Sequence, residues 1–370
     1  MKKCMVFAIM VCSLFFSASV DAKEPIHIGL SAPMTGQQTG VGNNFKRGIE
    51  LGLDRISQTG GINGQSVKLI VRDSQGSAKM AKRIARKFAE DKRIVAVIGD
   101  YTSTCSMAAQ PVYHRAGMVQ LSPTSSHPSY APGSPFSFGI PGTDQVLCSF
   151  LARAAVKRLQ KKKLAVLYLN NDWGAAAQKI FADEARKLGA EVLAAESYLE
   201  ETRDFIPVLE KLRSKGPEGL FLISLYTDGE RIIRQRHQLG WNEVAVIGSP
   251  DLYFPKNLRV GDEEVKNLYT VTYFFPDRSR AEVRKFMEEY ETRHNEIPDQ
   301  NAALAFDAVN LLARAMKTGG TERRAIRDEL ARIKDFPGVT GKTSFTEHGD
   351  VIKEYPLLHV KNGEFVVYSE

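Results

Sequence analysis

The sequence predicts an α/β protein of two lobes, each built around its own sheet. Three observations support this class: short apolar strands alternate with amphipathic helices, the alternation resumes after a passage rich in Pro, Gly and Ser at 122–142, and a chain of 370 residues is too long for one compact core. Strands that alternate with helices of this length form parallel sheets covered by helices on both faces.

The first 22 residues have the pattern of an export signal. Lys2 and Lys3 give a positive start, residues 5–16 form an apolar run, and the small residues Val20 and Ala22 suit cleavage after about Ala22. The run is shorter than the about 20 apolar residues that cross a bilayer. No cysteine lies at the cleavage point, so we expect a free periplasmic protein rather than a lipid-anchored one.

The first lobe is expected to follow directly. Its strands are predicted at 26–30, 67–71, 94–98 and 118–121, and its helices at 42–56, 78–90 and from about residue 106. In the helix 78–90, Met80, Ile84 and Phe88 recur every four positions and predict a core-facing stripe. The Lys and Arg residues between them then form a solvated face, so the net charge of +7 does not indicate a nucleic-acid partner.

A second series of elements predicts the second lobe. Strands are expected at 164–169, 191–197, 220–224 and 244–247, and helices at 175–188, 205–215 and 229–239. The basic run 161–163 is interpreted as the C-terminal end of a helix. The last third predicts helices at 280–294, 302–317 and 321–333, and strands at 355–360 and 364–368 joined by the turn sequence Asn362-Gly363.

The last third has too few strands for a third sheet, so its elements complete the first two lobes. Each lobe is then discontinuous in sequence. Residues 23–144 with 276–349 form the first lobe, and residues 145–275 with 350–370 form the second.

Two cysteines, Cys105 and Cys148, remain once the signal is removed. In an oxidising compartment they can form a disulfide, and the alternative is a pair of small buried thiols. The sequence leaves both alternatives open.

Catalytic and metal-binding signatures are not found in the sequence. It contains neither a GxSxG nucleophile elbow nor an HExxH zinc motif, and its seven histidines do not have metal-ligand spacing. We therefore expect a protein that is not an enzyme and that holds no metal or cofactor.

Polar clusters follow several predicted strands at their carboxyl ends, where open parallel sheets place their ligands. Tyr101, Thr102 and Ser103 precede a helix, where free N–H groups and hydroxyls suit a carboxylate; simple helix capping is the alternative. In the next cluster, the carbonyl of Thr124 can accept from an ammonium and Ser126 can donate to a carboxylate, although this is also a common turn composition.

Aromatic and acidic residues follow the strands of the second lobe. Trp173 lies beside a helix start, where it either covers an apolar ligand group or packs in an interface. Tyr226 follows one strand, and Asp251 and Tyr253 follow another. An acid beside aromatic rings can hold an ammonium, while a solvated loop aspartate is the alternative. Together, the clusters of both lobes are complementary to a zwitterion.

Four segments carry a family resemblance. The sequences IGLSAPMTG at 28–36, GGING at 60–64, IG at 98–99 and SPTSS at 122–126 resemble the leucine/isoleucine/valine-binding proteins of ABC importers, a branch of the type I periplasmic binding proteins. The similarity runs in order along essentially the whole mature chain. It implies two Rossmann-like lobes that are joined by three crossovers and close on one ligand.

The resemblance assigns head-group contacts by position. Thr102 and Ser103 match the segment that holds the ligand carboxylate. Thr124 matches a carbonyl contact to the ammonium, and Ser126 a polar contact to the ligand backbone. Asp251 falls at or beside the acidic partner of the ammonium, where the family often has the longer Glu.

It also assigns the residues around the ligand side chain. Trp173 and Tyr226 match aromatic contacts, while Val41 takes the place of one. Together with Tyr101 and Tyr253, these residues are expected to decide which side chain fits.

The resemblance implies a periplasmic substrate-binding protein. It is expected to be a monomer that captures a branched-chain or other apolar amino acid between its lobes and delivers it to an inner-membrane ABC permease. Alternatives are a ligand-sensing co-receptor of the same fold, a binder of amides or aromatic carboxylates, and an exported α/β enzyme.

Overall fold

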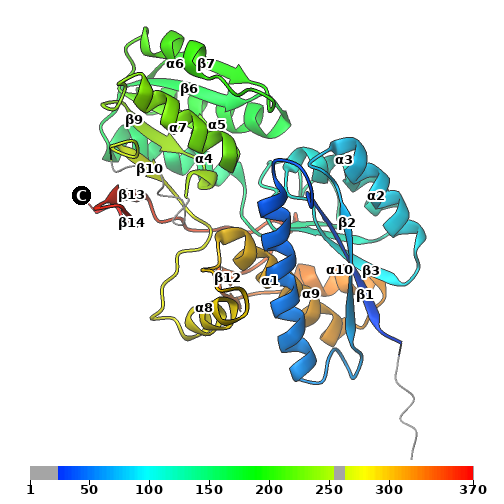
Figure 1. Cartoon of the computed structure of the whole chain (residues 1–370). Coiled ribbons are helices and arrows are strands. Elements are labelled where there is room, and N and C mark those ends of the chain that lie inside the picture. Colours follow the sequence, from blue (N-terminus) through cyan, green and yellow to red (C-terminus); the bar gives the residue numbers. More distant parts are fainter. Residues whose placement is uncertain (1–23, 254–262, 370) are drawn as a thin grey trace, which may run out of the picture.

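The computed structural model describes residues 24–253 and 263–369. It contains a five-stranded sheet of order β2-β1-β3-β4-β5 and a seven-stranded sheet of order β14-β13-β10-β9-β8-β6-β7, which lie in separate lobes (Figure 1). The predicted α/β class with two lobes is therefore confirmed. The export signal and its cleavage after about Ala22 lie outside the described residues.

The first lobe is built on five parallel strands. These are β1 (Ile26–Ala32), β2 (Val67–Asp73), β3 (Ile94–Gly99), β4 (Val119–Ser122) and β5 (Ser137–Gly139), joined by α1 (Thr39–Gln58), α2 (Ala78–Glu90) and α3 (Ser103–Arg115). Side chains alternate between the two faces of the sheet. Ile28 and Ile98 lie in the core that also contains residues of α1, whereas Val97 packs with residues of α2 and α3.

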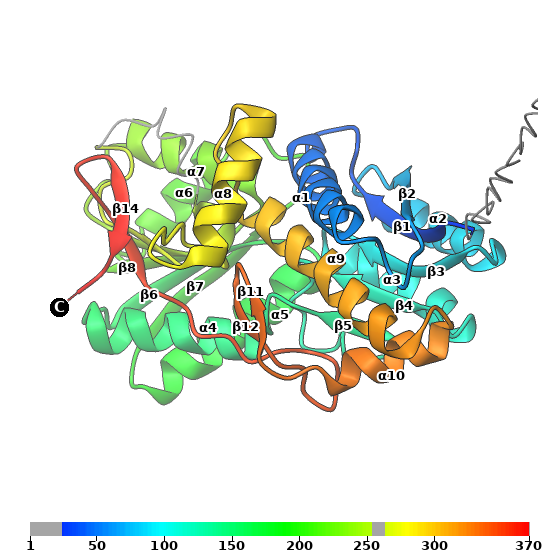
Figure 2. The same ribbon diagram turned by 90° about the horizontal axis from the view of Figure 1, so that it is seen from below.

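Segments from the last third of the chain also lie in this lobe. They are α8 (Ala281–His294), α9 (Gln300–Gly319), α10 (Arg323–Arg332) and the hairpin of β11 (Phe336–Gly338) and β12 (Gly341–Thr343). Helix α9 lies alongside α1 (Figures 1 and 2). The two helices approach so closely that a Cβ atom on Gly48 of α1 would lie 2.1 Å from the carbonyl oxygen of Ala302.

The second lobe contains five parallel strands followed by an antiparallel hairpin. The strands are β6 (Lys163–Leu169), β7 (Glu191–Tyr198), β8 (Gly219–Ile223), β9 (Ala245–Gly248), β10 (Leu268–Thr270), β13 (Leu358–Lys361) and β14 (Glu364–Val367). Its helices are α4 (Asp144–Arg153), which continues as a π-helical segment (Ala154–Arg158), α5 (Asp172–Lys187), α6 (Ile206–Arg213) and α7 (Tyr226–Gln238).

Several elements differ from their sequence predictions. Helices α1, α3, α5 and α7 each begin three residues before the predicted start. For α3 and α5 the reason is a side-chain cap: Thr102 accepts from the N–H of Cys105, and Asn171 from the N–H of Gly174. Helix α4 and strands β5, β10, β11 and β12 were not predicted. The basic run 161–163 is not a helix end, because the π-helical segment ends at Arg158 and β6 starts at Lys163.

The structure bears on the cysteine pair and on membrane-spanning helices. Cys105 and Cys148 are both buried and unbonded, so they are two thiols rather than a disulfide. Burial raises the pKa of the Cys105 thiol to about 12, which keeps it protonated. Among the described residues, none of the helices combines the length and apolar character needed to cross a membrane.

The chain passes between the lobes three times: from β5 to α4, from β10 to α8, and from β12 to β13 (Figure 2). Residues of the three passages pack together. The rings of Tyr273 and Tyr355 are 6.1 Å apart, and the Tyr355 hydroxyl donates to the carbonyl of Pro141 over 3.0 Å. The pKa values of Tyr273 and Tyr355 are raised, mainly by burial and in part by the neighbouring carboxyl of Asp144.

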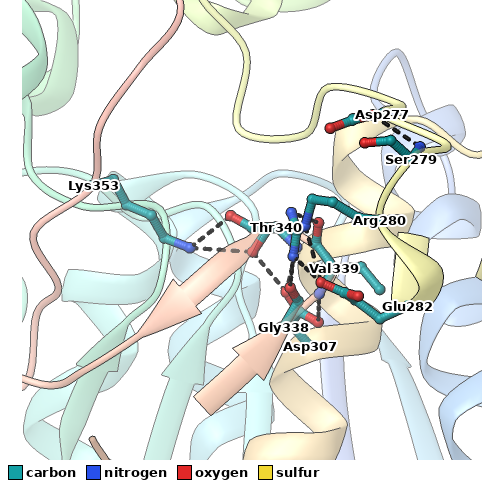
Figure 3. A network of polar contacts seen from close by, with 9 residues as sticks. All are labelled: Asp277, Ser279, Arg280, Glu282, Asp307, Gly338, Val339, Thr340 and Lys353. Carbon is teal, nitrogen blue, oxygen red and sulfur yellow. Dashed lines mark hydrogen bonds and ion pairs between the residues drawn. The ribbon is translucent and has the colours of Figure 1, made fainter. Parts of the chain in front are cut away.

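A buried carboxylate fixes the hairpin β11–β12 against α9. Asp307 accepts from the N–H of Val339 over 2.9 Å and from both the N–H and the hydroxyl of Thr340, over 2.8 and 2.6 Å (Figure 3). Lys353, in the third passage, donates to the carbonyl and hydroxyl oxygens of Thr340 over 3.1 and 3.2 Å. The network therefore ties the hairpin to both the first lobe and the hinge.

Asp307→Asn should destabilise the fold, because an amide that replaces the carboxylate turns an N–H toward one of three buried donors. We expect the free energy of unfolding to fall by about 2 kcal/mol in urea denaturation. The control is Asp183→Asn on α5, whose carboxylate forms exposed ion pairs and should contribute less than about 1 kcal/mol. Equal losses in both variants would contradict the structural role of Asp307.

Asp144→Asn should change how stability depends on pH. Burial raises the pKa of Asp144 to about 8, and the side chains of Ser126 and Trp173 offset part of this increase. An Asp in the unfolded chain has a pKa of about 3.9. Between this value and the folded-state pKa of about 8, Asp144 keeps a proton in the folded chain that it releases in the unfolded chain. The contribution of wild-type Asp144 to stability therefore falls as the pH rises through this window.

The variant lacks this titration, so its stability relative to the wild type should increase with pH, by at most about 1.4 kcal/mol per pH unit. Urea denaturation at pH 5 and pH 8 measures the difference. A flat difference for Asp144→Asn would contradict the buried-acid assignment.

Candidate functional site

The sequence-predicted site residues line two adjoining pockets between the lobes. Seven line an inner pocket: Tyr101, Thr102, Ser103, Thr124, Ser126, Trp173 and Asp251. Val41, Tyr226 and Tyr253 line an outer pocket, to which Asp251 also contributes. The inner pocket encloses about 30 Å³, enough for about two water-sized groups. The outer pocket encloses about 380 Å³, which suits an organic side chain.

A buried acid at the end of β3 positions the first part of the inner pocket. Asp100 accepts from the hydroxyls of Ser31 and Ser74, over 2.8 and 3.1 Å, and from the N–H of Tyr101 over 2.7 Å. It thereby joins segments at the ends of three neighbouring strands. Gly99 permits the turn, since it has a φ of +117° and a Cβ atom there would lie 2.0 Å from the carbonyl oxygen of Ser31.

The start of α3 presents donors to the inner pocket. The Thr102 hydroxyl caps the helix, so the capping alternative holds for this side chain. The Ser103 hydroxyl accepts from the N–H groups of Ser126 and His127, both over 3.2 Å, and its own hydrogen is left to donate. The first N–H groups of a helix also have no acceptor within it, so this helix start can receive a carboxylate.

The second polar cluster uses its side chains within the protein. The Thr124 hydroxyl donates to the carbonyl of Tyr101 over 2.6 Å, and the carbonyl of Ser126 accepts from the N–H of Asp144 over 2.8 Å. What Thr124 can offer a ligand is therefore its backbone carbonyl. The second bond ties the cluster to the first passage between the lobes.

Asp251 is the acid of the site. It lies in a short turn, Pro250–Leu252, after β9, and its carboxylate accepts from the Tyr101 hydroxyl over 2.9 Å across the cleft. Burial raises the pKa of Asp251 to about 6, and the Tyr101 hydrogen bond offsets part of this increase. Asp251 is thus ionised at neutral pH. None of the described residues that line the two pockets is Lys or Arg.

Trp173, Tyr226 and Val41 lie at helix starts rather than in loops. Trp173 is in the first turn of α5 and is buried, and Tyr226 is the first residue of α7. Val41 lies in the first turn of α1, because the helix already begins at Thr39. The nearby Gly42 is not a flexible loop residue: a Cβ atom there would lie 2.1 Å from the carbonyl oxygen of Pro33.

Several lining residues were not predicted from the sequence. Leu225, Tyr273, Gln300 and Asn301 line the inner pocket, and the last two also line the outer pocket. The sequence Pro298-Asp299 is a helix-start signal that would have directed attention to this segment, since Asp299 caps α9 through the N–H of Ala302. Tyr273 follows a strand of only three residues and had no comparable signal.

The arrangement suits a small zwitterion. Donors at the start of α3 face the same inner pocket as an ionised carboxylate that has no cationic partner among its lining residues. The described residues contain no cluster of His, Cys, Asp and Glu that could hold a metal ion.

Known proteins with similar sequences and structures are solute-binding proteins. An "Amino acid binding protein" of Pseudomonas aeruginosa is 24% identical over 95% of this chain and 91% of its own length. The substrate-binding protein LivJ of Streptococcus pneumoniae, solved with isoleucine, has a TM-score of 0.85 at 25% identity, covering 92% of this chain and 98% of its own. A putative branched-chain amino acid ABC transporter protein of Rhodospirillum rubrum is 32% identical with a TM-score of 0.71, covering 93% of this chain and 100% of its own.

A family model agrees with these similarities and with the two-lobed fold. The model described as "Periplasmic binding protein" matches residues 25–364, nearly all of the part that the structure describes. The resemblance drawn from the sequence is thereby confirmed, and the chain belongs to the periplasmic binding protein family.

Proposed function

We propose that this chain captures an amino acid with an apolar side chain between its lobes and delivers it to an ABC permease of the inner membrane. The observation that carries the proposal is the position of the buried Asp251 carboxyl, which lines the same pocket as the α3 start and has no Lys or Arg beside it among the described lining residues. A buried carboxylate requires a partner, and the ammonium of an amino acid supplies one.

The division into two pockets supports the same ligand class. The inner pocket groups Ser103 and the start of α3 with Asp251 and the Thr124 carbonyl, so a head group at this end of the cleft would turn its carboxylate toward the first pair and its ammonium toward the second. The outer pocket offers Val41 and the rings of Tyr226 and Tyr253 to the side chain. The names of the similar proteins, which refer to amino acids and to isoleucine, point to the same ligands.

Capture would proceed by hinge closure. A ligand that contacts both lobes stabilises the closed state by its differential affinity for that state. The proposed lobes are residues 23–144 with 276–349 and residues 145–275 with 350–370. Two of the proposed boundaries lie in the passages from β10 to α8 and from β12 to β13, and the third follows Asp144, the first residue of α4; the packing of the passages on one another supports a single hinge. We further propose export to the periplasm with cleavage after about Ala22, action as a monomer, and no enzymatic activity.

Calorimetric titration with L-leucine, L-isoleucine, L-valine, other amino acids, acetamide and benzoate tests the function. We expect the apolar amino acids to bind most tightly. If none of these compounds binds to the ligand-free protein, the proposal is wrong.

Asp251→Ala should weaken binding of the best amino acid by about 2 kcal/mol or more, because a desolvated ammonium loses its charged partner. Titration calorimetry measures the loss. The matched control is Asp172→Ala: this acid precedes Trp173 on the same cleft edge but is exposed and lines neither pocket, so its loss should change the affinity little. A near-neutral Asp251→Ala would instead indicate a carboxylate ligand without an amine.

A further inference from the structure

Gln300 connects the first lobe to the turn Pro250–Leu252 of the second lobe and to the second passage between the lobes. It is the first residue of α9 and belongs to the first lobe, only 6% of its surface is exposed, and it lines both pockets. The hydrogen-bond partners of its carboxamide, however, lie outside the first lobe.

The Gln300 side chain bonds to the second lobe and to the hinge at once. Its Nε2 donates to the carbonyl of Pro250 over 2.9 Å. Its Oε1 accepts from the hydroxyl of Thr272 and from the N–H of Tyr273, both over 3.1 Å. Pro250 directly precedes Asp251, and Thr272 and Tyr273 lie in the second passage between the lobes.

A neutral carboxamide is suited to this position. The site needs a donor for a buried carbonyl and an acceptor for a buried N–H within one side chain, and among uncharged side chains of this length only Gln supplies both. Because Oε1 already accepts two hydrogen bonds, Gln300 is not the acceptor for a ligand ammonium. Its carboxamide forms hydrogen bonds to protein groups rather than to a ligand.

The turn that carries Asp251 is therefore held from the first lobe at two points. Gln300 bonds the backbone at Pro250, and the Tyr101 hydroxyl bonds the side chain of Asp251 itself. Both bonds exist only when the lobes are together. Removing the Gln300 carboxamide takes one of two donors from the carbonyl of Pro250, which keeps the N–H of Tyr253, and leaves the N–H of Tyr273 without its acceptor, which is costly in the closed state.

We propose that Gln300 is a positioning residue that couples closure of the lobes to the placement of Asp251. The inference rests on the proposed function, in which Asp251 receives the ammonium. Gln300 acts through the turn Pro250–Leu252 and the second passage rather than through the ligand.

The test compares Gln300→Met with the matched control Gln110→Met. Methionine has similar length and volume but forms neither type of hydrogen bond. Gln110 is also buried, and its Nε2 donates to the carbonyl of Tyr130 and the hydroxyl of Ser137, so all its bonds lie within the first lobe. In calorimetry with L-leucine, Gln300→Met should bind about tenfold more weakly or worse, and Gln110→Met within about twofold of the wild type. Equal losses in both variants would overturn the proposal.

A second measurement needs no ligand. Spin labels at Lys82→Cys on α2 and Lys187→Cys on α5, both exposed positions in different lobes, report the distance between the lobes by double electron–electron resonance. Gln300→Met should shift this distance distribution to larger values, and Gln110→Met should leave it unchanged. Weaker binding with an unchanged distribution would mean that Gln300 contacts the ligand directly, and would overturn the proposal. If the wild type binds no amino acid, the proposed function fails, and the distance measurement alone decides the role of Gln300.

Discussion

The hydrogen bond between Tyr101 and Asp251 is the contact on which the arrangement of the cleft depends. It joins a residue that follows β3 of the first sheet to a residue that follows β9 of the second, so the carboxyl ends of the two sheets face each other. A carboxylate buried at this point is costly without a charged partner, and one neutral hydroxyl offsets only part of that cost. A cation bound at the junction of the lobes would therefore stabilise the Asp251 carboxylate.

The three passages between the lobes explain how this junction can open without loss of structure. Each lobe has its own sheet and its own helices, and the first lobe is closed by segments from the last third of the chain, with α9 against α1 and Asp307 against the hairpin β11–β12. The lobes can therefore move as units. The passages pack on one another through Tyr273, Tyr355 and Pro141, so the proposed closing motion would be confined to one region.

Sequence reasoning predicted what local chemistry encodes. Apolar runs located the main strands, and residues after those strands located most of the lining of the inner pocket. It placed several helix starts too late, because polar and glycine-containing sequences there are also typical of loops. Ser103, Trp173 and Tyr226 lie in the first turns of their helices rather than before them. It also missed Gln300, because the role of a carboxamide depends on its partner. That partner, Pro250, is 50 residues away, and no local pattern announces such a pair.

The sizes of the two pockets separate the questions of ligand class and ligand identity. The inner pocket is small and polar, and its groups are held in place because Asp100, Ser103 and Asp251 accept hydrogen bonds from Ser31, Ser126 and Tyr101, respectively. The outer pocket is more than ten times larger, and its lining combines Val41, Ile297 and two tyrosines with amides and the acids Glu296 and Asp299. In the proposed function, discrimination among amino acids would come from how completely a side chain fills the space beside Val41, since apolar contact scales with the area removed from water.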